Sequence, residues 1–322
     1  MPENRPEDRT ARQAGRGRTA DQPSEFPWTA WRDIALRVKR EFANDQLSLL
    51  AAGIAFYGLL ALFPGLAVLV SVYAMLSDAA TVADHVNALA MVPQGVRDLV
   101  REQLVGLSRA SETTVGASLL GGFLLSLWSA SKALRALVSA MNVAYDETET
   151  RGWLHRTILG LSFTLVSITA GFFALLVIAA LPAAFEQAGW GLMALALPWI
   201  VTLLAFAGWL AMLYRYGPSR ADARWRWITP GSIAATLIWL LGSVGFSAYV
   251  AHFGRYNDTY GSMGATVVLL LWFWLSAWAV LLGAELNAEM EHQTAEDTTT
   301  GGDQPRGQRD AYVADHVGDA PD

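Results

Sequence analysis

The chain has 322 residues, of which 53% are hydrophobic and 16% are charged, and its formal net charge is −6. A soluble domain carries about 25% charged residues, so the composition argues against a soluble globular protein. The sequence has no cysteine, which excludes disulfides, thiolate catalysis and zinc–thiolate sites.

The N-terminal 46 residues divide into two parts. Residues 1–25 are rich in Arg, Pro, Gly and acids without apolar periodicity, which predicts a disordered cytoplasmic tail. Residues 26–46 place apolar side chains at helical spacing beside basic ones, which predicts an amphipathic interfacial helix; a short polar lead-in to the first span is the alternative. The first apolar run is too long for a cleaved signal peptide, so we expect an uncleaved anchor.

Residues 47–292 contain six long apolar stretches, each long enough to span a membrane as a helix. They cover residues 47–76, 115–141, 157–185, 191–214, 228–252 and 263–287. The predicted fold class is therefore all-α, a polytopic bundle of six transmembrane helices. Residues 293–322 are polar again, and we predict a second disordered cytoplasmic tail.

The connection over residues 77–114 carries a helical pattern of its own. Val96, Leu99, Val100, Leu104 and Leu107 share one helical face, which predicts an amphipathic helix at the outer membrane surface. It is either a lid over a cavity or a packed connector.

Basic residues gather in alternate connections, which sets the expected orientation. They flank the first span and follow the second and the fourth: Arg32, Arg37, Lys39, Arg40, Arg151, Arg156, Arg215, Arg220, Arg224 and Arg226. The connection after the third span has none, and the one after the fifth has only Arg255. We therefore expect a multi-pass protein of the cytoplasmic (inner) membrane with both termini in the cytoplasm.

Signatures of catalysis are scarce. The five histidines are widely scattered, without the i, i+4 pair of a zincin helix, and the sequence contains no P-loop, dinucleotide fingerprint or GxSxG motif. We expect no enzyme activity, no metal site and no cofactor.

Three charges fall at one depth in the membrane. Glu285 lies 22 residues after the start of the sixth span, or ~33 Å along a helix. Lys132 and Arg135 lie 17 and 20 residues into the second span, or ~25–30 Å. Charges in a membrane are costly unless they are paired, snorkel or face water, so we expect Glu285 to meet Lys132 or Arg135, directly or through water. The cluster is either a structural clasp or part of a polar cavity for a charged head group.

Two further sequence patterns each allow two interpretations. In the second span small residues recur every four positions, at Ser118, Gly122, Ser126 and Ala130; they form a helix-packing seam or a hydrophilic track. The loop HFGRYNDTYGSMG (252–264) presents Tyr256, Tyr260 and Gly261, as an interfacial anchoring turn or a binding loop.

Several segments together resemble the YihY/BrkB family of inner-membrane proteins, formerly labelled ribonuclease BN. They are AFYGLLALFP (55–64), LWSASKALRALVSAMNVAY (127–145), YRYGPSR (214–220), WRWITPG (225–231) and YGSMGATVVLLLWFWLSAWAVLLGAELN (260–287). The resemblance covers about residues 30–292 and implies six spans in the cytoplasmic membrane.

The resemblance does not supply a secure activity. It suggests a protein that moves or binds a lipid or other amphiphile, with membrane lipids as partners. A non-transporting scaffold for envelope integrity is the alternative, and a ribonuclease is disfavoured because the chain lacks a His-x-His-x-Asp-His cluster. We expect no nucleic-acid partner, since topology already explains the basic loops; a homo-oligomer is compatible with the sequence.

Overall fold

The computed structural model of the protein describes residues 15–76, 112–187, 191–253 and 262–319. The elements in chain order are η1 (Pro23–Glu25), α2 (Trp28–Asn44), α3 (Leu47–Leu76), α6 (Glu112–Ala144), α7 (Trp153–Gln187), α8 (Gly191–Tyr216), α9 (Trp225–Phe253), α11 (Ser262–Gln293) and α12 (Tyr312–Asp315). The described ranges hold no strand beyond one isolated bridge between Ala223 and Thr299. The predicted all-α fold is confirmed.

Three helices are long and apolar enough to cross a membrane. The qualifying stretches are Ala196–Tyr216 in α8, Trp225–Val250 in α9 and Thr266–Gln293 in α11. A bent pair, α2 with the first part of α3, would add a fourth span; its two helices meet at 61°. Six spans therefore remain a prediction, and the outer helix predicted over residues 77–114 falls almost wholly outside the described residues.

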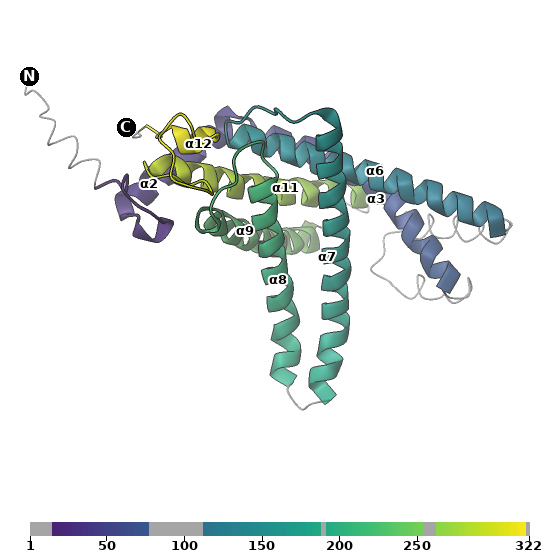
Figure 1. The fold of residues 1–322 in the computed structure, drawn as a ribbon. Coiled ribbons are helices and arrows are strands. Elements are labelled where there is room, and N and C mark those ends of the chain that lie inside the picture. The colour runs from purple at the N-terminus through teal and green to yellow at the C-terminus, as the bar shows by residue number, and fades with distance from the viewer. Residues whose placement is uncertain (1–14, 77–111, 188–190, 254–261, 320–322) are drawn as a thin grey trace, which may run out of the picture.

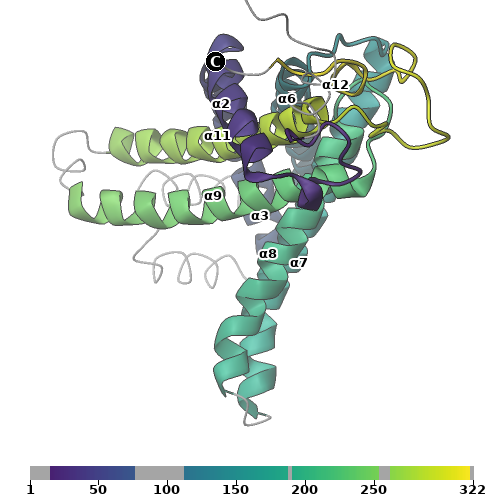
Figure 2. The same ribbon diagram turned by 90° about the vertical axis from the view of Figure 1, so that its left-hand side faces the viewer.

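The six long helices are arranged as three pairs, and the pairs diverge from one common end of the molecule. α7 and α8 run side by side away from the other helices, while α9 and α11 form a second pair and α3 and α6 a third (Figures 1 and 2). The helices do not form one parallel bundle. Short connections, α2 and the described parts of both termini lie at the shared end, which we call the hub.

The hub contains the densest packing. Leu47, Met141, Leu210 and Leu281 are fully buried there, one each from α3, α6, α8 and α11. α9 and α11 approach closely at Gly231, where an added Cβ would clash with the side chain of Asn287 and the carbonyl of Gly283. The sequence supplies glycine at the point where two helix backbones meet.

The predicted helix after residue 25 is present as α2. Its Ile34 and Val38 are buried in a cluster with Trp227 of α9 and Met290 of α11. The predicted apolar face is therefore used for packing against other helices. Arg37 is buried on the same side and donates hydrogen bonds to the side chain and carbonyl of Glu289 and to Gln293.

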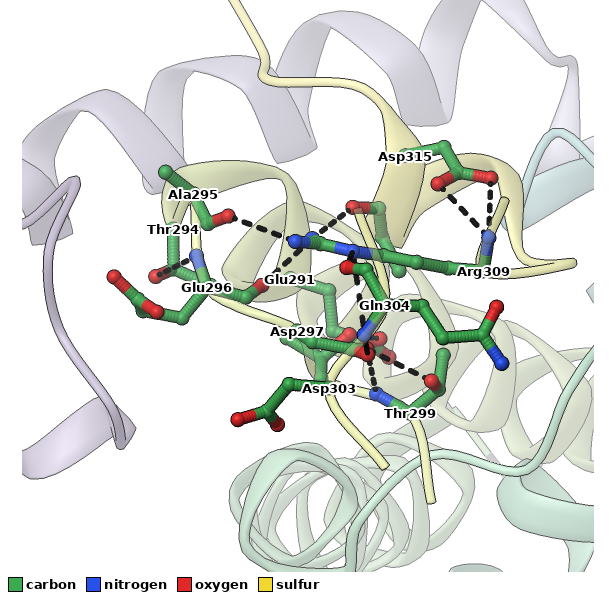
Figure 3. Close-up of polar contacts among 12 residues, drawn as sticks. Glu291, Thr294, Ala295, Glu296, Asp297, Thr299, Asp303, Gln304, Arg309 and Asp315 are labelled. Atoms are coloured by element: carbon green, nitrogen blue, oxygen red, sulfur yellow. Dashed lines mark hydrogen bonds and ion pairs between the residues drawn. The ribbon is translucent and has the colours of Figure 1, made fainter. Parts of the chain in front are cut away.

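Residues 294–319, which we call the C-terminal strap, are not the disordered tail that the sequence predicts. Arg309 donates to the carbonyls of Ala295, Glu296, Gln304 and Ala314, and its neighbours form further polar contacts (Figure 3). Asp297 accepts hydrogen bonds from the backbone N–H groups of Thr299 and Gln304. Polar side chains that bind backbone groups order this segment, and a composition-based prediction of disorder does not detect them.

The N-terminal segment is also more ordered than predicted from residue 15 onward. Arg18 donates to the carbonyls of His292, Gln293 and Gly318. The two described chain ends are thereby joined at the hub.

Candidate functional site

A polar pocket of about 560 Å³ opens at the hub, where two helix connections meet the strap. Its lining residues come from the α6–α7 connection with the first turn of α7, the end of α8 with the α8–α9 connection, and the strap: Glu147, Thr148, Thr150, Arg151, His155, Tyr216, Pro218, Ser219, Arg220, Ala221, Asp222 and Asp310. The lining carries both signs of charge and several hydroxyl groups.

Asn142, near the end of α6, joins the two connections. Its amide nitrogen donates to Glu149 at 3.1 Å, and its amide oxygen accepts the backbone N–H of Ser219 at 2.8 Å. Arg151 donates to both carboxylate oxygens of Glu149 and to the carbonyl of Gly217. The pocket walls are therefore held by side chains before any ligand binds.

The Glu149 carboxylate is the acceptor at the centre of this network. Burial raises the pKa of a carboxyl group, but the hydrogen bonds from the side chain and backbone of Arg151 outweigh burial and lower the pKa of Glu149 to about 2. Glu149 is therefore ionised at neutral pH and keeps Arg151 in place.

The floor of the pocket is a buried ion pair. Arg220 donates to both oxygens of Glu291 at 3.1 and 2.6 Å, and the hydroxyl of Thr298 donates to the same carboxylate. The side chains of Arg220 and Glu291 are 2% and 0% exposed. The pair ties the α8–α9 connection to α11 and to the strap.

The strap supplies one wall. The carbonyl of Asp310 accepts the N–H of Ala221, and the N–H of Tyr312 donates to Glu147, at 2.8 and 2.7 Å. Burial raises the pKa of Glu147, an effect that the hydrogen bond from Tyr312 partly offsets. His155 is exposed, and no hydrogen bond joins its ring to any residue in the described ranges, so the ring is free to meet a ligand.

An apolar slot of about 250 Å³ lies between α7, α8 and α9. Small residues of α7 form one side, and aromatic rings of α8 and α9 form another; the lining residues are Ser167, Ala170, Gly171, Ala174, Thr202, Leu203, Ala205, Phe206, Trp209 and Trp239. A Cβ added at Gly171 would meet nothing within 4 Å.

The slot and the polar pocket share a face of α8. Thr202, Trp209 and Tyr216 follow one another at seven-residue intervals, which places them on one side of a helix. Tyr216 borders the pocket, whereas Thr202 and Trp209 border the slot. At 1.5 Å per residue, the two slot residues lie ~21 and ~10 Å along the helix from Tyr216.

In the described residues no direct ion pair joins Glu285 to Lys132 or Arg135, and the water-mediated contact stays a prediction. Lys132 Nζ lies 3.6 Å from the centre of the Trp128 ring, and Arg135 binds Ser131 and Thr157. Glu285 is buried and its Oε2 has no hydrogen-bond partner.

The absence of a direct pair has a geometric origin. Depth along a helix follows from counting residues, but the direction of a side chain around the helix also depends on how the helices pack. Each base contacts a residue one turn away on its own helix, Trp128 for Lys132 and Ser131 for Arg135, and Arg135 also donates to Thr157 of α7.

The remaining predicted sites are only partly described. Ser118, Gly122, Ser126 and Ala130 all lie on α6, which packs against α3 and α7. Gly122 and Ala130 are half-buried; their role as a seam or a track remains a prediction. Tyr256, Tyr260 and Gly261 lie outside the described residues.

The polar pocket itself was not predicted as a site. Arg151 and Arg220 were used only to predict the topology. The signal that points to the pocket is a hydroxyl side chain beside each of these bases, Thr150 and Ser219, and the two hydroxyls bond each other at 3.1 Å.

Comparison with known proteins identifies the family. Residues 38–308 match the family model described as Virulence factor BrkB. The chain belongs to the BrkB family. This BrkB-family membrane protein is 29% identical over 286 residues to a UPF0761 membrane protein of Tolumonas auensis, a match that covers 82% of this chain and 89% of the relative.

Two other relatives are similar to the chain. The ribonuclease-like protein YfkH of Bacillus subtilis is 29% identical over 255 residues, covering 74% of this chain and 88% of the relative. The UPF0761 membrane protein Smlt0865 of Stenotrophomonas maltophilia is 30% identical over 261 residues, covering 77% of this chain and 58% of the relative. No solved structure matches the chain.

Proposed function

We propose that this BrkB-family protein binds a lipid or other amphiphile along α8, with the head group in the polar pocket and a hydrocarbon chain in the apolar slot. The supporting observation is the shared face of α8 that carries Thr202, Trp209 and Tyr216. One leaflet of a ~30 Å hydrocarbon core is ~15 Å thick. This thickness lies between the ~10 and ~21 Å that separate Trp209 and Thr202 from the pocket residue Tyr216 along α8.

The chemistry of the two cavities suits the two ends of an amphiphile. The pocket combines Arg151 and His155 with the carboxylates of Glu147 and Asp222, so a head group that carries both charges would find partners. The slot is nearly all apolar. We place the hub in the cytoplasm, because the basic residues of the two connections lie there and positive residues favour that side.

The test is mass spectrometry of lipids retained by the protein in native membrane particles. His155→Glu changes the charge of the pocket at an exposed side chain without a hydrogen bond in the described structure, so folding should be unaffected. Lys39→Glu is the control, because Lys39 is exposed on α2 and does not line the pocket. We expect His155→Glu to change the identity or amount of retained lipid and Lys39→Glu to behave as the wild type.

The contrary result has a definite meaning. If the wild type and both variants retain the same lipids in the same amounts as the surrounding membrane, the lipid-binding proposal is wrong. A non-transporting scaffold, built on the packed hub, would then be the better account.

A further inference from the structure

We infer that Lys132 and Arg135 form a second lipid site, on the exposed face of α6, and that this site binds the phosphate of an anionic phospholipid. Neither base lines the polar pocket or the apolar slot. The inference is therefore separate from the proposed function and can hold or fail without it.

The two bases lack a direct acidic partner. Within the described ranges no ion pair joins Lys132 or Arg135 to a carboxylate, whereas Arg151 and Arg220 each pair with a glutamate. Counting residues places Lys132 and Arg135 ~25–30 Å along the predicted second span, close to one boundary of a ~30 Å hydrocarbon core. A charge at that depth is costly unless it is paired, snorkels or faces water, so an anion there would stabilise both bases.

Both side chains keep hydrogen-bond donors for a ligand. The ammonium of Lys132 lies 3.6 Å from the centre of the Trp128 ring and makes no hydrogen bond with the described part of the chain. The guanidinium of Arg135 donates to the carbonyl and hydroxyl of Ser131 at 3.2 and 3.5 Å and to the hydroxyl of Thr157 at 3.4 Å. An ammonium has three N–H donors and a guanidinium has five. Donors therefore remain unused on both bases, and both side chains are partly exposed.

The face of α6 that carries the bases changes from apolar to polar along its length. Leu124, Trp128, Lys132, Arg135 and Ser139 follow one another at spacings of three or four residues, which places them on one side of the helix. Leu124 and Trp128 are 54% and 52% exposed, and Ser139 is also exposed. Apolar side chains come first, then an aromatic ring, then two bases and a hydroxyl nearest the hub. A phospholipid presents its chains, glycerol and phosphate in the same order.

α7 borders the site at its hub end. An added Cβ at Gly160 would clash with the side chain of Arg135, so the two helices touch there, and the hydrogen bond from Arg135 to Thr157 joins the same pair. Away from the hub α6 and α7 diverge (Figure 1). The phosphate would thus meet side chains of both helices, while the lipid chains would lie against α6.

The net charge of the two bases selects the class of lipid. An ammonium binds a phosphate as a point charge, and a guanidinium can bind it through two parallel hydrogen bonds. A zwitterionic phospholipid also has a phosphate, but its own cation cancels that charge and would lie close to two further cations. Phosphatidylglycerol has the phosphate without the cation, so it should bind better.

The experiment compares phosphatidylglycerol with phosphatidylcholine of equal chain length. Both are present in equal amounts in nanodiscs that hold the full-length protein, and native mass spectrometry counts the lipids that the protein retains. One base near a membrane surface favours an anionic lipid by a factor of about five, so the wild type should prefer phosphatidylglycerol about 25-fold. Lys132→Gln and Arg135→Gln should each lower this preference about five-fold, and Lys132→Arg should keep it.

Two matched controls remove the same charges elsewhere. Lys39→Gln changes an exposed lysine of α2, and Arg306→Gln changes an exposed arginine of the strap. Both variants should keep the preference of the wild type.

Each outcome has a definite meaning. A wild type that retains both lipids equally refutes the inference, and that comparison needs no variant. A preference that Lys132→Gln leaves unchanged, or that Lys39→Gln lowers as much, also refutes it, because the anionic lipid would then bind elsewhere. Lys132→Gln breaks no hydrogen bond within the described ranges, so it decides the question even if Arg135→Gln fails to fold. The His155→Glu test of the polar pocket is independent of these results.

Discussion

Replacing Glu291 by Gln should destabilise the protein strongly, because the change leaves a buried guanidinium without its counter-charge. Arg220 donates to both oxygens of Glu291, and the two side chains are 2% and 0% exposed. Removing one partner of a buried pair costs about 3–5 kcal/mol. At about 2–4 °C per kcal/mol for larger domains, thermal unfolding in detergent, followed by tryptophan fluorescence, should occur at least about 6 °C lower.

Two further variants make the comparison decisive. The double replacement Arg220→Met with Glu291→Leu removes both charges and should recover most of the loss. Asp303→Asn breaks a pair with Arg224 in which the aspartate side chain is 84% exposed, and should cost less than about 1 kcal/mol. If Glu291→Gln shifts the unfolding temperature no more than Asp303→Asn does, the Arg220–Glu291 pair is not buried and the hub is packed differently.

Three other predictions follow from the hub and its helices. The pKa of Glu149 is about 2 in the folded protein, below its ordinary value of 4.5, so the contribution of Glu149 to stability is full above pH ~4.5 and is lost as the pH falls toward 2. Glu149→Gln should therefore lower the unfolding temperature at pH 7, and this difference should shrink below pH 4. A difference that does not depend on pH would contradict this explanation. Gly231→Ala should remove the peak of folded protein in size-exclusion chromatography, because the added Cβ clashes with Asn287. Gly245→Ala has open space around its Cβ and should elute as the wild type. Equal elution of the two variants would disprove the close approach of α9 and α11. Tyr214→Phe removes a buried 2.7 Å hydrogen bond to the carbonyl of Val280, and this should cost about 1 kcal/mol of stability, measured by thermal unfolding. Tyr216→Phe changes an exposed residue and should have no effect on the unfolding temperature. A larger loss for Tyr216→Phe than for Tyr214→Phe would mean that the hydroxyl of Tyr214 is not the buried one.

Helices were the easiest part to predict from sequence, because long apolar runs have few alternatives in hydrocarbon. The predicted stretch 228–252 corresponds to α9, and the stretch 157–185 lies within α7. How the pairs diverge could not be predicted, since the apolar faces of these helices carry no strong directional pattern. The contacts that set the arrangement, such as Gly231 against Asn287, join residues more than fifty positions apart.

The candidate site was harder to predict for the same reason. Counting residues along a helix predicts the depth of Lys132 and Glu285 but not the side of the helix from which each projects. The polar pocket depends on Asn142 bridging to Ser219, 77 residues later, and no local pattern indicates such a contact. The strap depends on Arg309 and Asp297 finding backbone partners, which a polar composition does not distinguish from disorder.

The hydrogen bond from Arg18 to the carbonyl of Gly318 has a consequence for biogenesis. The two residues are 300 positions apart, so at 5–20 residues per second a ribosome needs about 15–60 s to produce the second after the first. For most of that interval the nascent chain inserts its helices while Arg18 has none of its three carbonyl acceptors. A stop codon between codons 294 and 318 would release a polypeptide that keeps α11 but lacks Gly318, so Arg18 would retain only the carbonyls of His292 and Gln293 as acceptors.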